Sequence, residues 1–191
     1  MRDRCIDLLA PSIETSRTPV VVDATLGLGG HTEALLARFP ELIVIGIDRD
    51  PSALLQARQR LSIFGDRLIT SHAVFDSITD VINSHGYSQL SGVLFDLGVS
   101  SMQLDETDRG FSYSHDAPLD MRMDSTQVIT AYEIVNHYEP GALVKILRTF
   151  GEEKFATRIV ENIVKARAIA PLNSTMQLAT LVKESIPAAT R

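Results

Sequence analysis

The chain has 191 residues, 45% of them hydrophobic, and a formal net charge of −6, so it can form one domain or two small ones with a real core. Its single cysteine, Cys5, excludes an internal disulfide, and no apolar run is long enough to span a bilayer. Acids interrupt the first residues, which do not resemble a signal peptide, so we expect a soluble cytoplasmic protein.

The first predicted elements are a short apolar strand over residues 20–22 and a helix over 31–38. Between them, residues 23–31 have the sequence Asp-Ala-Thr-Leu-Gly-Leu-Gly-Gly-His. Glycines leave bare backbone in such a turn, so a nucleotide-like cofactor can approach it closely. The segment therefore predicts a cofactor site where this strand meets this helix.

Charge and spacing discriminate between two classes of cofactor. A dinucleotide brings a pyrophosphate that prefers helix N-terminal amides and the spacing G-x-G-x-x-G, but Thr32 occupies the third glycine position here. S-adenosylmethionine carries a sulfonium and an ammonium group and no phosphate, so the Asp23 carboxylate would attract it and repel a pyrophosphate. We therefore expect S-adenosylmethionine as the cofactor.

A second predicted strand, over residues 43–47, leads directly into Asp48. A ribose-binding acid in a βαβ nucleotide site follows the glycine turn by about 20 residues, which is where Asp48 lies. Asp48 could instead cap the helix predicted over 51–61, but Asp50 is better placed for that cap. We expect Asp48 to bind the ribose.

The alternation of strands and helices continues to about residue 99, with a strand over 67–70, a helix over 76–84 and a strand over 92–95. It predicts an α/β fold whose parallel, Rossmann-like sheet is incomplete and holds only the first four strands. In the doubly wound order 3-2-1-4 the strand over 92–95 lies at an edge. Because soluble proteins avoid open apolar edges, we expect strands beyond Arg191 or a second copy to cover it.

The fourth strand ends at Asp96. In open α/β sheets, ligands bind beyond the carboxyl ends of the strands, where the strand order reverses, so Asp96 would face the same crevice as Asp23 and Gly29. A carboxylate there suits methyl transfer to an exocyclic amine, because a hydrogen bond accepted by Asp96 would orient this poor nucleophile. An acid that only caps the following turn fits its position equally well.

Residues 101–125 form a polar segment, rich in Asp and Gly, that is longer than an ordinary connection and is expected to be functional or disordered. Its aspartates lack the spacing of a calcium loop, and Arg109 and Arg122 can pair with several of them, so no metal site is expected. Four helices are predicted after it, over residues 131–138, 140–149, 152–168 and 174–185. Ser174 caps the last of them, which predicts a second, helical unit.

Charge is unevenly distributed between these parts of the chain. Residues 101–140 hold eight acids and two bases, whereas residues 141–191 hold eight bases and four acids. Lys154, Arg158 and Lys165 share one face of a predicted helix. That face is either simply solvated or contacts RNA phosphates.

Six segments carry a resemblance to a known family. They are residues 23–31, 47–51, 96–105, 109–112, 118–124 and 150–153, with Asp-Leu-Gly-Val-Ser-Ser-Met-Gln-Leu-Asp and Pro-Leu-Asp-Met-Arg-Met-Asp as the most specific blocks. Together they resemble the bacterial small-subunit ribosomal RNA cytosine-N4 methyltransferases, the RsmH or MraW type. The resemblance implies a class I methyltransferase sheet with an added all-helical domain. It divides the chain into a partial S-adenosylmethionine-binding domain, residues 1–103, and a partial substrate-recognition domain, residues 104–191.

The resemblance also implies a set of site residues. Those expected to contact S-adenosylmethionine are Gly29, Gly30, His31, Asp48, Phe75, Asp96 and Gln103. Among them Asp48 would hold the ribose, Phe75 would lie near the adenine, and Asp96 would also be catalytic. From the residues alone, the preferred interpretations are a core aromatic for Phe75 and a polar residue at a helix terminus for His31.

The function implied by the resemblance is methylation of the N4 amine of a cytidine in small-subunit (16S) rRNA, with the rRNA or the 30S particle as partner. The exposed sheet edge, independently of the resemblance, makes a homodimer an option. Because the sheet is truncated, a non-catalytic cofactor-binding or ribosome-assembly module is the alternative. A carbon-5 cytosine methyltransferase needs a cysteine nucleophile, but Cys5 precedes every motif. A DNA amino-methyltransferase would show Asp-Pro-Pro-aromatic where this chain has Asp-Leu-Gly-Val at residues 96–99.

Overall fold

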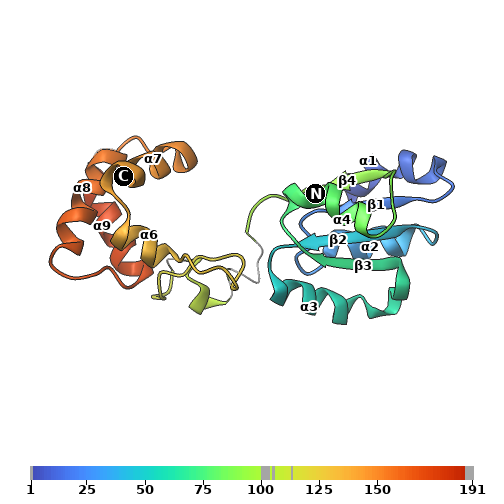
Figure 1. The fold of residues 1–191 in the computed structure, drawn as a ribbon, viewed down its shortest axis with the longest axis horizontal. Coiled ribbons are helices and arrows are strands. Elements are labelled where there is room, and N and C mark those ends of the chain that lie inside the picture. Colours follow the sequence, from blue (N-terminus) through green and yellow to red (C-terminus); the bar gives the residue numbers. More distant parts are fainter. Residues whose placement is uncertain (1, 100–103, 105, 113, 188–191) are drawn as a thin grey trace. The chain divides into compact units, whose positions relative to one another are not determined.

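The computed structural model describes residues 2–99, 104, 106–112 and 114–187, and the chain divides into two compact units, residues 1–98 and 99–191. The first unit combines helices with a parallel sheet, and the second is built from helices and an irregular segment (Figure 1). Among the described residues, no helix combines the length and the apolar content needed to cross a bilayer.

The sheet of the first unit has four parallel strands. They are β1 (Val20–Asp23), β2 (Ile43–Asp48), β3 (Leu68–His72) and β4 (Gly92–Leu94). Their order is β3-β2-β1-β4, which confirms the predicted arrangement and leaves β4 at an edge of the sheet that the described residues form. β1 and β2 are central and read as continuous apolar runs, because a parallel strand in the middle of a sheet is covered on both faces.

Helices pack on both faces of this sheet. They are α1 (Arg2–Thr15), α2 (Gly30–Arg38), α3 (Pro51–Arg60) and α4 (Ile78–Ser84), with 3-10 turns at Ser62–Arg67 and Phe75–Ser77. Val21 and Val44 pack with residues of α1 and α2, whereas Val22 and Ile45 pack with α4. The alternation follows from the two-residue repeat of a strand, which sends successive side chains to opposite faces.

The N-terminal helix α1 has no counterpart among the predicted elements. Pro11 lies inside it, and because proline lacks an N–H and crowds the preceding turn, its presence favours a break over a helix. Ile6, Ala10 and Ile13 are nevertheless spaced at helical intervals, and all three are buried against the sheet. Burial of this apolar face stabilises the helix despite the proline.

The second unit contains the helices α6 (Ala131–His137), α7 (Pro140–Gly151), α8 (Ala156–Arg167) and α9 (Thr175–Ser185), and its core is formed mainly by their apolar faces. The predicted cap of the last helix is confirmed, because the Ser174 hydroxyl accepts a hydrogen bond from the Gln177 N–H. The predicted start of α8 at residue 152 is wrong. Glu152 has a left-handed φ of 50° and ends α7, so α8 begins four residues later.

The described part of the polar segment is tied together by two arginines. Arg109 donates hydrogen bonds to the carbonyl oxygens of Arg122 and Met123, at 2.9 and 2.8 Å. The guanidinium of Arg122 donates two further bonds to the Asp120 carboxylate. These contacts fold the segment back on itself, and a bridge between Pro118 and Ser174 joins it to the start of α9.

Candidate active site

The glycine turn lies between the end of β1 and the start of α2, as predicted. Its backbone is held from both sides, because the Ala24 N–H donates to the Leu94 carbonyl and the Leu26 N–H donates to the Ile47 carbonyl. Gly29 has a φ of 77°, and a Cβ added there would lie 2.5 Å from a side-chain carbon of Leu61. The left-handed backbone conformation therefore favours glycine at this position, and any larger residue would also displace the Leu61 side chain.

Gly30, the first residue of α2, differs from Gly29 in its surroundings. A Cβ added at Gly30 would meet no atom within 4 Å. The space in front of the helix start is therefore open, and bare backbone faces it. This is the arrangement that lets a ligand approach the first turn of a helix closely.

Asp48 joins the end of β2 to this turn. Its carboxylate accepts a hydrogen bond from the Gly27 N–H at 2.7 Å and another from the Asp50 N–H at 2.9 Å. Asp50 in turn accepts from the Ser52 N–H and caps α3, which confirms the predicted cap. Because each carboxylate oxygen can accept two hydrogen bonds, the half-buried Asp48 keeps acceptor capacity for a ligand.

Asp23 does not present its charge to this site, contrary to our expectation. The side chain is only 1% exposed, and its Oδ2 accepts a hydrogen bond of 2.7 Å from the Thr32 hydroxyl. Burial, which disfavours the charged form, raises the pKa of the Asp23 carboxyl. Asp23 thus anchors α2 to β1, and attraction of a cationic ligand has to come from Asp48 and Asp96.

Asp96 follows β4 and lies at the same end of the sheet as the glycine turn. Its N–H donates a hydrogen bond of 2.7 Å to the Thr25 hydroxyl, which joins the segments that follow β4 and β1. The Asp96 side chain is 62% exposed, and its Oδ2 lies 3.7 Å from Nδ1 of His31. His31 Nε2 is buried and has no hydrogen-bond partner in the part of the chain that the structure describes.

Phe75 is not a core aromatic. It follows β3 at the start of the 3-10 turn Phe75–Ser77, and it is 41% exposed. Its ring meets that of Phe95 edge to face, with centroids 5.9 Å apart. Phe95 is also exposed and directly precedes Asp96, so the pair forms an apolar surface next to Asp96 in the chain.

The structure thus brings together most of the predicted site residues at the carboxyl ends of the strands. Gly29, Gly30 and His31 lie at the start of α2, with Asp48 and Asp96 hydrogen-bonded to the turn segments beside it. Gln103 lies outside the described residues. Sequence reasoning missed the hydroxyl of Thr25, since its position within a motif does not show that it reaches the backbone after β4.

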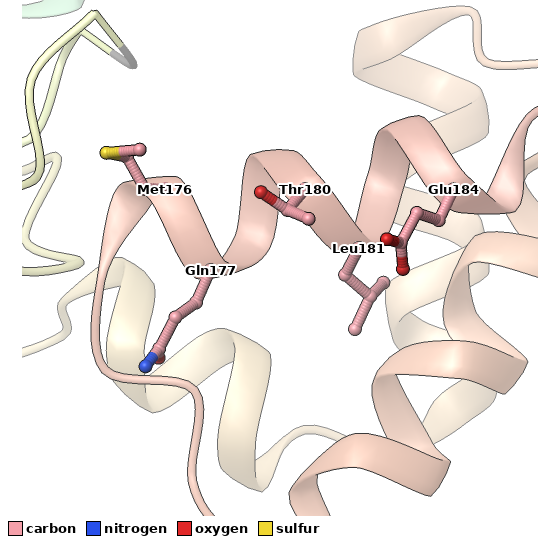
Figure 2. Close-up of a pocket in the computed structure, with 5 residues that line it drawn as sticks. All are labelled: Met176, Gln177, Thr180, Leu181 and Glu184. Atoms are coloured by element: carbon pink, nitrogen blue, oxygen red, sulfur yellow. The ribbon is translucent and has the colours of Figure 1, made fainter.

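Two surface hollows are lined by other parts of the chain. One is formed by a single face of α9, whose lining residues Figure 2 shows: Met176, Gln177, Thr180, Leu181 and Glu184. The other lies at the amino ends of β1 and β4 and is lined largely by serine and threonine. Neither contains a predicted site residue, and neither joins a glycine turn to carboxylates, so the carboxyl end of the sheet is the better candidate.

Known proteins are similar to this chain over almost its whole length. Residues 1–191 match the MraW methylase family. A ribosomal RNA small subunit methyltransferase H from Kocuria rhizophila is 56% identical over 187 residues, which are 98% of this chain and 57% of that protein. The protein of the same name from Streptomyces avermitilis is 53% identical over 191 residues, which are 100% of this chain and 60% of that protein. The chain therefore spans between half and two thirds of the length of these relatives.

Among solved structures, an rRNA methylase from Streptococcus thermophilus overlaps 60% of this chain and 66% of its own, with 23% identity and a TM-score of 0.41. A likeness at that level supports no conclusion about the site.

Proposed function

Because the chain belongs to the MraW methylase family, we propose that this protein transfers a methyl group from S-adenosylmethionine to the N4 amine of a cytidine in small-subunit rRNA. The observation that carries the proposal is the position of Asp96, an exposed carboxylate beside the glycine turn of a chain that matches the family from end to end.

The groups at the carboxyl end of the sheet fit S-adenosylmethionine. The open space at Gly30 would let the cofactor lie against the start of α2, and Asp48 would accept hydrogen bonds from the ribose hydroxyls. The exposed ring of Phe75 would contact the adenine, and Asp96 would offset the positive charge of the cofactor. When bound there, the cofactor supplies an electrophilic methyl group.

Asp96 would also act on the substrate. The N4 amine of cytosine is a poor nucleophile, because its lone pair is delocalised into the ring. A hydrogen bond from this amine to the Asp96 carboxylate would orient the nitrogen for attack, and the same carboxylate would receive the proton that the nitrogen loses. The 62% exposure of the Asp96 side chain leaves it accessible to an incoming base.

The two domains predicted from the sequence would have different roles. Residues 1–103 would bind the cofactor, and residues 104–191 would recognise the rRNA, either free or within a 30S particle, in the cytoplasm. The excess of bases in residues 141–191 supports an RNA contact. Arg158 and Lys165 are exposed on α8, whereas Lys154 is exposed in the turn that precedes that helix and so does not share its face as predicted.

The open edge of β4 needs a partner as well. Val93 of β4 is exposed, as are Phe95 and Leu97 just after the strand, and the unpaired backbone of an apolar edge strand is a template for pairing. We propose that it pairs with a strand from a longer form of the protein or, in a homodimer, from a second copy. If the second copy is the partner, this chain will elute as a dimer, and an Arg at Val93 will make it monomeric.

A cofactor-binding or assembly module without catalysis is the second candidate. One observation favours it: within the described residues, no strand pairs with the outer edge of β4. Such a module would bind S-adenosylhomocysteine and 30S particles but transfer no methyl group.

One experiment separates the two. The chain is incubated with 30S particles or free rRNA and a labelled methyl donor, and the digested RNA is analysed by mass spectrometry, with the Kocuria protein as a positive control. We expect N4-methylcytidine with the wild-type chain and none with Asp96→Ala. Cofactor binding without any methylated cytidine would overturn the catalytic proposal for this chain.

A further inference from the structure

The turn between α7 and α8 presents an unusually exposed aromatic ring. Phe150, in the last turn of α7, is 82% exposed. Arg148 precedes it by two residues, and Lys154 and Arg158 follow on the other side of the turn, all with exposed side chains. We refer to these four residues as the α7–α8 tip.

The exposure of Phe150 is not what the sequence pattern predicts. Phe150 follows Leu143 by seven residues and Leu147 by three, so it has the helical phase of the side chains that α7 packs into the core. α7, however, ends at Gly151, and Phe155, from the far side of the turn, packs against the core. The core is thus closed at this end by another phenylalanine, and Phe150 is left facing solvent.

The turn that carries Phe150 is held in a fixed conformation. Glu152 has a φ of 50°, a region that residues other than glycine rarely adopt, and the N–H groups of Glu152 and Glu153 both donate to the Leu147 carbonyl. The Glu153 carboxylate accepts from the Phe155 N–H at 2.6 Å. A strained residue persists only where its surroundings hold it, and such residues cluster at functional sites.

The charges around Phe150 favour an anionic partner. Arg148 donates a hydrogen bond of 3.0 Å to the Thr157 hydroxyl, so its guanidinium reaches from α7 to α8. Glu152 and Glu161 are exposed nearby and reduce the net charge, while Glu153 is engaged with the backbone. Three exposed cations thus lie within eight residues of Phe150 along the chain: Arg148 in α7, Lys154 in the turn and Arg158 in α8.

We propose that the α7–α8 tip binds single-stranded RNA, with Phe150 stacked on an unpaired base and Arg148, Lys154 and Arg158 contacting phosphates. Exposed aromatic rings among cations are how proteins hold unstacked bases. A protein partner would call for a wider apolar patch, but Thr149 and Gly151 flank the ring. That the RNA is small-subunit rRNA rests on the proposed function, whereas the binding itself does not.

The test measures how the full 191-residue chain binds a fluorescein-labelled single-stranded RNA of about 12 nucleotides, by anisotropy at several salt concentrations. We expect Phe150→Ala to weaken binding about tenfold without changing the salt dependence, and Phe150→Tyr to bind nearly as well as wild type. Lys154→Gln should lower the slope of log affinity against log salt by about 0.7. The matched control is Ile63→Ala, which removes a side chain that is 83% exposed on the other unit.

Several results would contradict RNA binding by the α7–α8 tip. The inference is wrong if the wild-type chain does not bind the RNA, if Phe150→Ala binds as Ile63→Ala does, or if Phe150→Tyr loses as much as Phe150→Ala. It is also wrong if Phe150→Ala loses affinity for 30S particles but not for naked RNA, because the tip would then contact a ribosomal protein. Methyl transfer is assayed separately, so a chain that binds RNA through Phe150 but transfers no methyl group contradicts only the proposed function.

Discussion

Oδ2 of Asp96 lies 3.7 Å from Nδ1 of His31, so the residue that follows β4 and the second residue of α2 meet at the glycine turn. The imidazole faces the carboxylate through one nitrogen, while its other nitrogen is buried. The Asp96 backbone is fixed independently by its bond to Thr25. This arrangement supports our proposal that the exposed carboxylate of Asp96 meets the nucleobase.

Asp96→Asn should remove methyl transfer without unfolding the protein. The amide keeps the shape of the side chain but is a poor acceptor for the proton that the amine loses, so we expect a rate lower by roughly 10²–10⁴-fold at saturating cofactor. Labelled methyl transfer to 30S particles measures the effect. Binding of S-adenosylhomocysteine, followed by calorimetry, ensures that the cofactor is saturating, and a variant that retains the wild-type rate would remove Asp96 from the mechanism.

Gly29 and Gly30 provide a matched pair of substitutions that separates stability from cofactor binding. Gly29→Ala places a Cβ at a left-handed φ and against Leu61, so it should cost about 1–2 kcal/mol of stability. Gly30→Ala adds its methyl group to open space at the start of a helix, so the free energy of unfolding should be unchanged or slightly higher.

Gly30→Ala should weaken cofactor binding even though it leaves stability unchanged. If the cofactor lies against this backbone, the Gly30→Ala methyl group occupies its space, and the affinity for S-adenosylhomocysteine should fall about tenfold or more, ~1.4 kcal/mol. Urea unfolding and titration calorimetry give the two quantities. Normal binding by a stable Gly30→Ala variant would place the cofactor elsewhere.

Much of the fold could be predicted because it depends on local signals. Short sequence patterns predict the apolar strands β1 and β2 and the helix caps at Asp50 and Ser174. The strand order follows from the doubly wound rule. α1 was missed because the local effect of Pro11 is overridden by packing against the sheet.

The site was predicted less completely, and for a different reason. A sequence shows that Asp23 follows a strand but not that Thr32 turns back to bond with it and closes it off from solvent. The start of α8 was misplaced because nothing in the composition of residues 152–155 signals the left-handed conformation of Glu152. The burial of Asp23 and the conformation of Glu152 both depend on three-dimensional contacts, which the periodicity of a sequence does not predict.

Burial of Asp23 should leave a pH-dependent signature in stability. Its pKa is raised in the folded state above the usual 3.8, so its contribution to stability is fully present below pH 3.8 and is lost as the pH rises through the folded-state value. Asp23→Asn cannot ionise. The difference in unfolding free energy, wild type minus variant, should therefore become less favourable with rising pH, by at most about 1.4 kcal/mol per pH unit. Urea unfolding of both proteins over a pH series measures it, and a difference that grows with pH would contradict the burial argument.

Asp120 should show the opposite sign. Hydrogen bonds from the Arg122 side chain, at 2.7 and 2.8 Å, lower the pKa of the Asp120 carboxyl below 3.8. Its contribution is then present above pH 3.8 and is lost as the pH falls through the folded-state value. Because the pair is partly exposed, Asp120→Asn should cost at most about 1 kcal/mol at neutral pH, and this cost should vanish in acid. Asp108→Asn, an exposed acid of the same segment, controls for the loss of one negative charge. If the two variants lose equal stability at every pH, the Asp120–Arg122 pair does not hold the segment in place.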